Sequence, residues 1–135
     1  MTESRASIQN PEKVIFGFFI VFALTINFGF FIGEIDNPAH HNVFELYAAI
    51  VVSVIATILK LGDSTHIGAV FLATSLVADL QLIAAAAVWG IAEYLSASEI
   101  TPSQMVVVVS LSGGALLANG ISVVLLVAET ISVRR

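Results

Sequence analysis

The sequence predicts an all-α integral membrane protein, an antiparallel bundle of four transmembrane helices with both termini in the cytoplasm. Three observations lead to this fold class: the scarcity of charge, four long apolar runs, and a one-sided distribution of lysine and arginine. Of the 135 residues, 58% are hydrophobic and 11% are charged. A soluble domain carries about 25% charged residues. Because so little charge cannot cover a water-facing surface, we expect lipid to surround most of the chain.

Four apolar runs follow one another along the chain. Each is close to the roughly 20 residues that a helix needs to cross the hydrocarbon core of a membrane. The first run is rich in phenylalanine and is expected to contact lipid, the second is the shortest, and the third is long enough to tilt. Because four spans leave no room for a soluble domain, residues 1–135 are predicted to form one transmembrane domain. The predicted spans cover residues 14–32, 44–59, 67–92 and 105–128.

The segments between the runs carry residues that end helices. Pro38 prevents a continuous helix through the first connector, because proline has no backbone N–H to donate. Gly62 follows the second run and suits the C-terminal end of a helix. Serine, threonine and proline mark the connector between the last two runs.

Lysine and arginine all fall on one side of the predicted membrane. Glu34, Asp36, Glu93 and Glu99 lie on the other side, where the sequence has no basic residue. Cytoplasmic loops are enriched in lysine and arginine. Both termini are therefore predicted to be cytoplasmic, and we expect the protein in the cytoplasmic (inner) membrane of a prokaryote. The five basic residues are Arg5, Lys13, Lys60, Arg134 and Arg135.

The third span carries an acid, Asp79, near its middle. A carboxylate facing lipid would be costly, so Asp79 is expected to face protein or water. Residues three or four apart share a face of a helix, and on this basis Ser75 and Glu93 lie on the same face as Asp79. No lysine or arginine lies inside the predicted spans. Asp79 is therefore interpreted either as a hydrogen-bonded structural anchor or as a group that binds a cation or carries a proton.

A polar stripe also runs along the second span. Glu45 lies near its outer end, Ser53 near its middle, and Lys60 at its inner end, all at helical spacing. With Asp79, Ser75 and Glu93, the residues Glu45 and Ser53 complete the predicted ion pathway.

The fourth span repeats small residues at every fourth position. Small residues allow membrane helices to approach closely, within one chain or between chains. We expect this face, with the small face of the third span, to support a homo-oligomer. The alternative interpretation is that the small face lines a narrow pathway. The repeat consists of Ser110, Gly114, Ala118 and Ser122.

The connector between the first two spans concentrates acids and imidazoles around His40 and His41. Both ligand types suit divalent metals. However, the spacing matches no known metal site, so no metal is predicted there. An acidic mouth that attracts cations is the favoured interpretation.

Several classes of function are excluded by what the sequence lacks. It has no cysteine and a net charge of −5, without the basic runs that nucleic-acid binding requires. It contains no phosphate-binding loop, zinc-protease motif or serine-hydrolase motif. We therefore predict neither an enzyme nor a cofactor.

Two functions remain as predictions. The first is a small homo-oligomeric cation channel or proton-coupled transporter, in which symmetry would turn Asp79 and Glu45 into acidic rings. The alternative is a non-catalytic accessory or scaffold subunit of a larger membrane complex. In that case the small-residue faces would dock a partner and Asp79 would anchor two helices.

Overall fold

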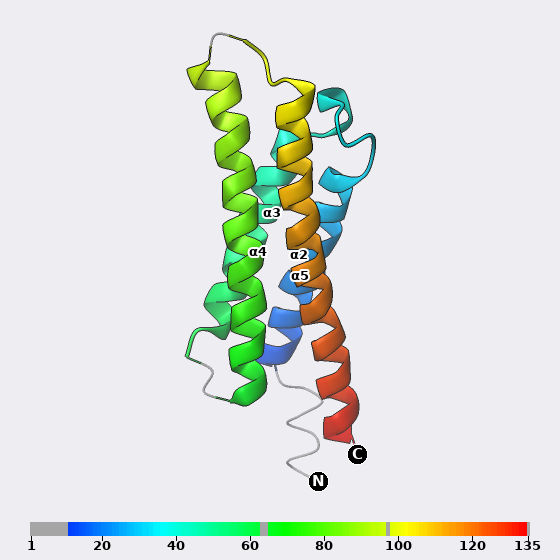
Figure 1. The fold of residues 1–135 in the computed structure, drawn as a ribbon. Helices are drawn as coiled ribbons and strands as arrows, with labels where there is room; N and C mark the ends of the chain where they lie inside the picture. The colour runs from blue at the N-terminus through cyan, green and yellow to red at the C-terminus, as the bar shows by residue number, and fades with distance from the viewer. Residues whose placement is uncertain (1–10, 63–64, 97, 135) are drawn as a thin grey trace.

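The computed structural model describes residues 11–62, 65–96 and 98–134, and these residues are helical apart from short connectors, with no strand among them. Four helices in the described part of the chain are long and apolar enough to cross a membrane. Figure 1 shows them lying side by side as an elongated bundle. They are α2 (Pro11–Phe31), α3 (Val43–Lys60), α4 (His66–Gly90) and α5 (Pro102–Arg134).

Local sequence signals define where the helices begin and end. Asn42 and Thr65 precede α3 and α4, and their side chains accept hydrogen bonds from the backbone N–H groups of Phe44 and Gly68. Such N-caps satisfy donors that have no partner inside the helix. Gly62 has φ +87°, which allows the chain to leave α3 in a left-handed conformation, as its place in the sequence predicts.

Two short elements flank the main helices. The 3-10 turn η1 (Pro38–His40) lies in the connector where Pro38 was predicted to stop the helix. The π-helical turn η2 (Ile91–Leu95) continues α4 beyond Gly90. Arg5, Asp63, Ser64 and Arg135 lie outside the described residues.

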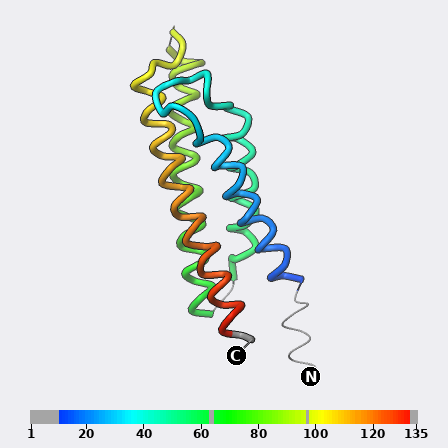
Figure 2. The backbone as a smooth tube through the Cα atoms, turned by 90° about the vertical axis from the view of Figure 1, so that its right-hand side faces the viewer, coloured from blue at the N-terminus to red at the C-terminus, as the bar shows by residue number. Residues whose placement is uncertain are grey.

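The four helices pack in a ring, in which α2 contacts α3 and α5, and α4 contacts the same two helices. Figures 1 and 2 show this arrangement from two directions. The predicted lipid-contacting role of the first span therefore describes only one side of α2. Its other side is buried, because Phe16, Ile20 and Phe30 have at most 1% of their surface exposed.

The two ends of the bundle differ in charge. Lys13 forms an ion pair with Glu129 of α5, with Nζ and Oε1 3.1 Å apart. Lys60 reaches the same end, because its Nζ lies 4.4 Å from the ring centroid of Phe16. We call this the basic end. The opposite end, with Glu34 in the connector after α2 and Glu93 in η2, is called the acidic end.

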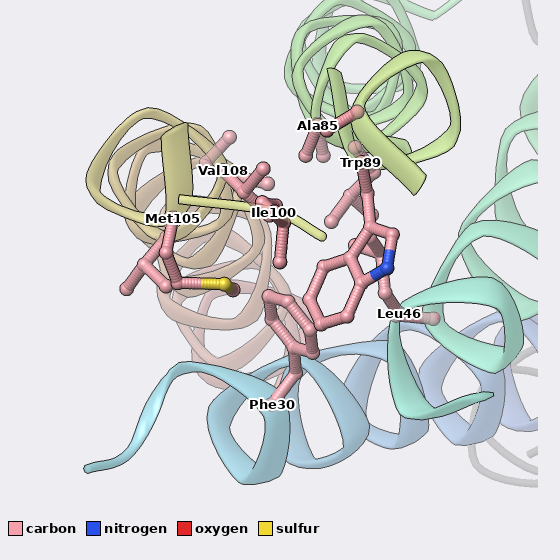
Figure 3. Packing of buried hydrophobic residues seen from close by; sticks show 14 residues of the cluster. Phe30, Leu46, Ala85, Trp89, Ile100, Met105 and Val108 are labelled. Atoms are coloured by element: carbon pink, nitrogen blue, oxygen red, sulfur yellow. The ribbon is translucent and has the colours of Figure 1, made fainter. Parts of the chain in front are cut away.

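Each end has its own cluster of buried apolar side chains. At the basic end, Phe16 and Phe71 stack edge to face with ring centroids 5.1 Å apart. At the acidic end, Trp89 packs 6.1 Å from Phe30 in a larger cluster that draws on all four helices (Figure 3). Other labelled members of the acidic-end cluster are Leu46, Ala85, Ile100, Met105 and Val108.

Candidate functional site

Between the two apolar clusters, every helix of the bundle buries at least one polar side chain. On α3, for example, Ser53 lies between Ala49 of the acidic-end cluster and Ala56 of the basic-end cluster. We call this set the polar layer. All members except Asp79 have 0% of their surface exposed, and Asp79 has 7%. The layer consists of Asn27, Ser53, Ser75, Asp79, Asn119 and Ser122.

Asp79 is held between α3 and α4 by two hydroxyl groups. Ser53 Oγ donates to Asp79 Oδ1 at 2.6 Å, and Thr57 Oγ1 lies 2.5 Å from Asp79 Oδ2. The distance of four residues between Ser53 and Thr57 is one helical turn, so both hydroxyls leave the same face of α3. Each carboxyl oxygen therefore has its own partner inside the protein.

The Thr57 hydroxyl is the pivotal member of this network. It carries one proton, yet two acceptors lie within reach: Asp79 Oδ2 and the backbone carbonyl of Ser53, the latter at 3.0 Å. If Asp79 is ionised, Thr57 donates to the carboxylate. If Asp79 is protonated, its own hydroxyl donates to Thr57, which then donates to the Ser53 carbonyl. The same atomic positions thus serve both protonation states.

Ser75 and Asn119 extend the polar layer toward α5. Ser75 lies one turn before Asp79 on α4. Its neighbour Thr74 forms a hydrogen bond with Ser122 of α5, with the two hydroxyl oxygens 2.5 Å apart, and this contact aligns α4 with α5. Ser75 Oγ and both polar atoms of the Asn119 side chain have no hydrogen-bond partner among the described residues. An unsatisfied buried polar group costs about 1–3 kcal/mol. Buried polar groups of this kind are commonly paired by ordered water in proteins.

Asn27 completes the layer on the α2 side, and both its Nδ2 and its Oδ1 have a partner. Its Nδ2 donates to the backbone carbonyl of Ser112 at 3.0 Å, and Ser112 Oγ donates to Asn27 Oδ1 at 2.5 Å. This reciprocal pair fastens α2 to α5. Polar groups in the layer therefore serve two purposes: some join helices, and others keep unused hydrogen-bonding capacity.

The remaining residues of the predicted ion pathway lie apart from Asp79. Glu45 is half-buried near the acidic end, and its carboxylate lies so close to Gly29 that a Cβ there would be 2.5 Å from Oε2. Glu93 lies in η2, beyond the C-terminal end of α4. Ser53 and Ser75 are the predicted residues that join Asp79 in the polar layer. Thr57, four residues after Ser53, was missed, although this spacing places it on the same helix face.

The small residues of α5 are used mainly inside the chain. Ala118 and Ser122 are buried in the bundle, whereas Ser110 is exposed. Gly114 lies against Gln81 of α4, whose Nε2 would be 2.5 Å from a Cβ at this position. Gln81 packs on α5, and its Oε1 has no hydrogen-bond partner among the described residues. The repeat thus lets α4 and α5 approach closely within one protomer.

Among the described residues, no three His, Asp or Glu side chains are grouped so that they could hold a metal ion. His40 and His41 both lie in the connector after α2. Each makes a hydrogen bond through its ring to the backbone of that connector.

These features define a small, all-helical membrane protein with a polar layer midway along its helices. The chain belongs to a family of unknown function, DUF6394, whose model matches residues 40–130. The matched segment includes Ser53, Thr57, Ser75, Asp79 and Asn119. No curated protein and no solved structure was found to match the chain.

Proposed function

We propose that the protein is a membrane transport protein in which Asp79 takes up and releases a proton. The observation that carries this proposal is the hydrogen-bond network of Asp79, which is satisfied whether the carboxyl group is ionised or protonated. A group that changes its charge without rearranging its neighbours is suited to carry a proton. Ionisable residues within membrane spans commonly mark proton relays and ion pathways.

Within the transport class, the packing favours proton coupling over an open pore. Asp79 is directed at α3 of its own chain and is 93% buried, since 7% of its surface is exposed. It is therefore poorly placed to form an acidic ring around an axis between protomers. Ser75 and Asn119 would hold water molecules that relay the proton across the bundle. Glu45 and Glu93, near the acidic end, would attract cations to the entrance.

The basic end is proposed to face the cytoplasm, which makes the bundle antiparallel with both termini inside. Lys13 and Lys60 lie at this end, and positive residues are retained on the cytoplasmic side. Self-association also remains a proposal. Because Ala118 and Ser122 are buried inside the protomer, an interface between two copies of the chain would have to use other parts of α4 and α5.

The second candidate function is a scaffold subunit of a larger membrane complex. It is favoured by the fact that both oxygens of Asp79 are paired across α3 and α4, as expected of a structural anchor. The two candidates differ in what happens when the carboxyl group can no longer titrate. A scaffold needs only the hydrogen bonds, whereas a proton carrier needs the change of charge.

Proton flux separates these functions. Purified protein in liposomes that enclose a pH-sensitive dye should dissipate an imposed pH gradient. Asp79→Asn should fold normally, because the amide keeps the size and hydrogen bonding of the carboxyl group. It should lose the proton flux, because an amide cannot take up and release a proton. Glu99→Gln, which removes an exposed acid from the last connector, is the control and should retain the flux. Full flux in folded Asp79→Asn would reject proton transport by Asp79.

A further inference from the structure

A buried histidine fastens the connector between α2 and α3. The side chain of His41 is 4% exposed, and its two ring nitrogens each meet a backbone carbonyl. Nδ1 lies 2.6 Å from the carbonyl oxygen of Phe30, and Nε2 lies 2.8 Å from that of Glu34. The ring thus bridges the last turn of α2 and the connector that follows it.

This geometry restricts the protonation state of the ring. A backbone carbonyl only accepts hydrogen bonds, and a neutral imidazole has one N–H group. Only the imidazolium form, with two N–H groups, donates to both carbonyls. Phe30 O belongs to the final turn of α2, where helix carbonyls lack partners inside the helix and can accept from a side chain.

The rest of the connector is arranged around this ring. His40, the neighbouring residue, has the opposite role: its Nδ1 accepts a hydrogen bond from the backbone N–H of Glu34 at 3.0 Å. Glu34 is therefore held on both sides by the two histidines. Gly33 has φ +115°, and a Cβ on it would lie 2.8 Å from the Cβ of His40, so glycine is needed for the chain to turn here.

His41 is also connected to the core of the acidic end. Its ring centroid lies 5.5 Å from that of Phe30, which in turn lies 6.1 Å from Trp89. The first three turns of α5, residues 102–112, contain no titratable side chain. The other titratable side chains at the acidic end are Glu34, Asp36 and His40 in the connector after α2, Glu45 and Tyr47 on α3, Glu93 and Tyr94 on η2, and Glu99 between η2 and α5.

We propose that His41 is a pH-sensitive latch for the connector between α2 and α3. As an imidazolium it holds the connector against the end of α2. When it loses a proton, one nitrogen turns a lone pair toward a carbonyl oxygen less than 3 Å away, so attraction becomes repulsion and the connector detaches. The latch is closed on the acidic side of the His41 titration and opens as the pH rises through it. This proposal does not depend on the function of Asp79.

The sole tryptophan makes the latch measurable, because Trp89 packs on Phe30 beside His41. In wild-type protein in nanodiscs, Trp89 emission should change over the pH range in which ¹⁵N NMR shows the His41 ring losing a proton. His41→Gln should lose this emission change. His40→Gln is the matched control and should keep it, since an amide oxygen also accepts from the N–H of Glu34.

Two results would overturn the latch. The first is titration of the His41 nitrogens in the wild type without a change in Trp89 emission or in hydrogen exchange at the Glu34 amide. This measurement needs no variant and therefore holds even if His41→Gln fails to fold. The second is a folded His41→Gln protein that keeps the wild-type emission change.

Discussion

At the scale of single residues, the chemistry of this protein depends on how one carboxyl group is accommodated. Asp79 is buried, but Ser53 and Thr57 supply one hydroxyl for each of its oxygens. The Thr57 hydroxyl also reaches the Ser53 carbonyl, which allows the proton of the network to shift without a change of rotamer. Threonine at this position is therefore expected to affect both stability and function.

Replacement of Thr57 by valine tests this network. Valine has nearly the same shape but no hydroxyl, so Asp79 Oδ2 loses its partner. We expect the free energy of unfolding to fall by about 0.6–2 kcal/mol, the range that covers hydrogen bonds between membrane helices in proteins and in model peptides. Titration with denaturing detergent measures it. Thr25→Val is the control, because Thr25 is exposed and donates only to Phe22 of its own helix. Equal effects of the two changes would argue against the network.

How much of the polar layer and of the hydrogen-bond network of Asp79 could be predicted depends on the kind of signal each residue gives. Asp79 was identified because an acid within an apolar run is conspicuous. Ser75 was identified because it shares a helix face with Asp79, and Ser53 because it lies on the polar stripe of α3. Thr57 was missed because threonine is common in apolar helices and has no charge to draw attention. Asn119 was visible in the sequence, but its lack of a partner is a property of packing between helices that no single helix reveals.

At the scale of secondary-structure elements, the contact between α4 and α5 depends on glycine at one position. Gly114 leaves room for the Gln81 side chain, which would be 2.5 Å from a Cβ at that site. Since Gln81 is flexible at its tip, alanine should be tolerated with a small shift of the amide group. A larger side chain cannot be accommodated in this way, because it would displace the helix itself.

Gly114→Leu should therefore separate α4 from α5 and lower the free energy of unfolding by about 1–3 kcal/mol, the usual cost of overpacking. Gly120→Leu makes the same change of size on the same helix, where no atom lies within 4 Å of an added Cβ, and should be tolerated. Detergent-induced unfolding of the two variants gives the comparison. A Gly114→Leu protein as stable as Gly120→Leu would contradict the close approach of these helices.

Helix boundaries were predicted less well than helix number. The apolar run predicted to end at residue 128 belongs to α5, which continues to Arg134. Apolarity marks the part of a helix that can lie in lipid, whereas hydrogen bonding continues through polar residues such as Glu129 and Thr130. Similarly, α2 begins at Pro11, a residue well suited to the first turn of a helix because its missing N–H would have no partner there.

At the scale of the whole molecule, the bundle buries an apolar cluster toward each end and has the polar layer between the two clusters. The basic end and the acidic end each have a closely packed cluster, while Ser75 and Asn119 keep unpaired polar atoms between them. Such a middle costs stability, because its polar groups are buried without full pairing. We infer that it is retained for function. A molecule built only to fill a membrane would be served better by an apolar layer.

The orientation of the bundle is a prediction for the whole molecule. Lys13 and Lys60 lie at one end, and the acidic connectors lie at the other. Reporter domains fused after Asn37 and after Ser98 should therefore be external, and one fused after Arg135 should be cytoplasmic. An external reporter after Arg135 would refute the cytoplasmic placement of the termini.

The proposed function requires Asp79 to change its protonation state within the folded bundle. Infrared difference spectra of the protein in lipid, recorded between acidic and alkaline pH, measure this directly, because a protonated and an ionised carboxyl group absorb at different frequencies. We predict a carboxyl band that appears on acidification and is missing in Asp79→Asn but present in Glu99→Gln. Identical difference spectra for the wild type and Asp79→Asn would show that Asp79 does not titrate and would contradict a proton-carrying role for this residue.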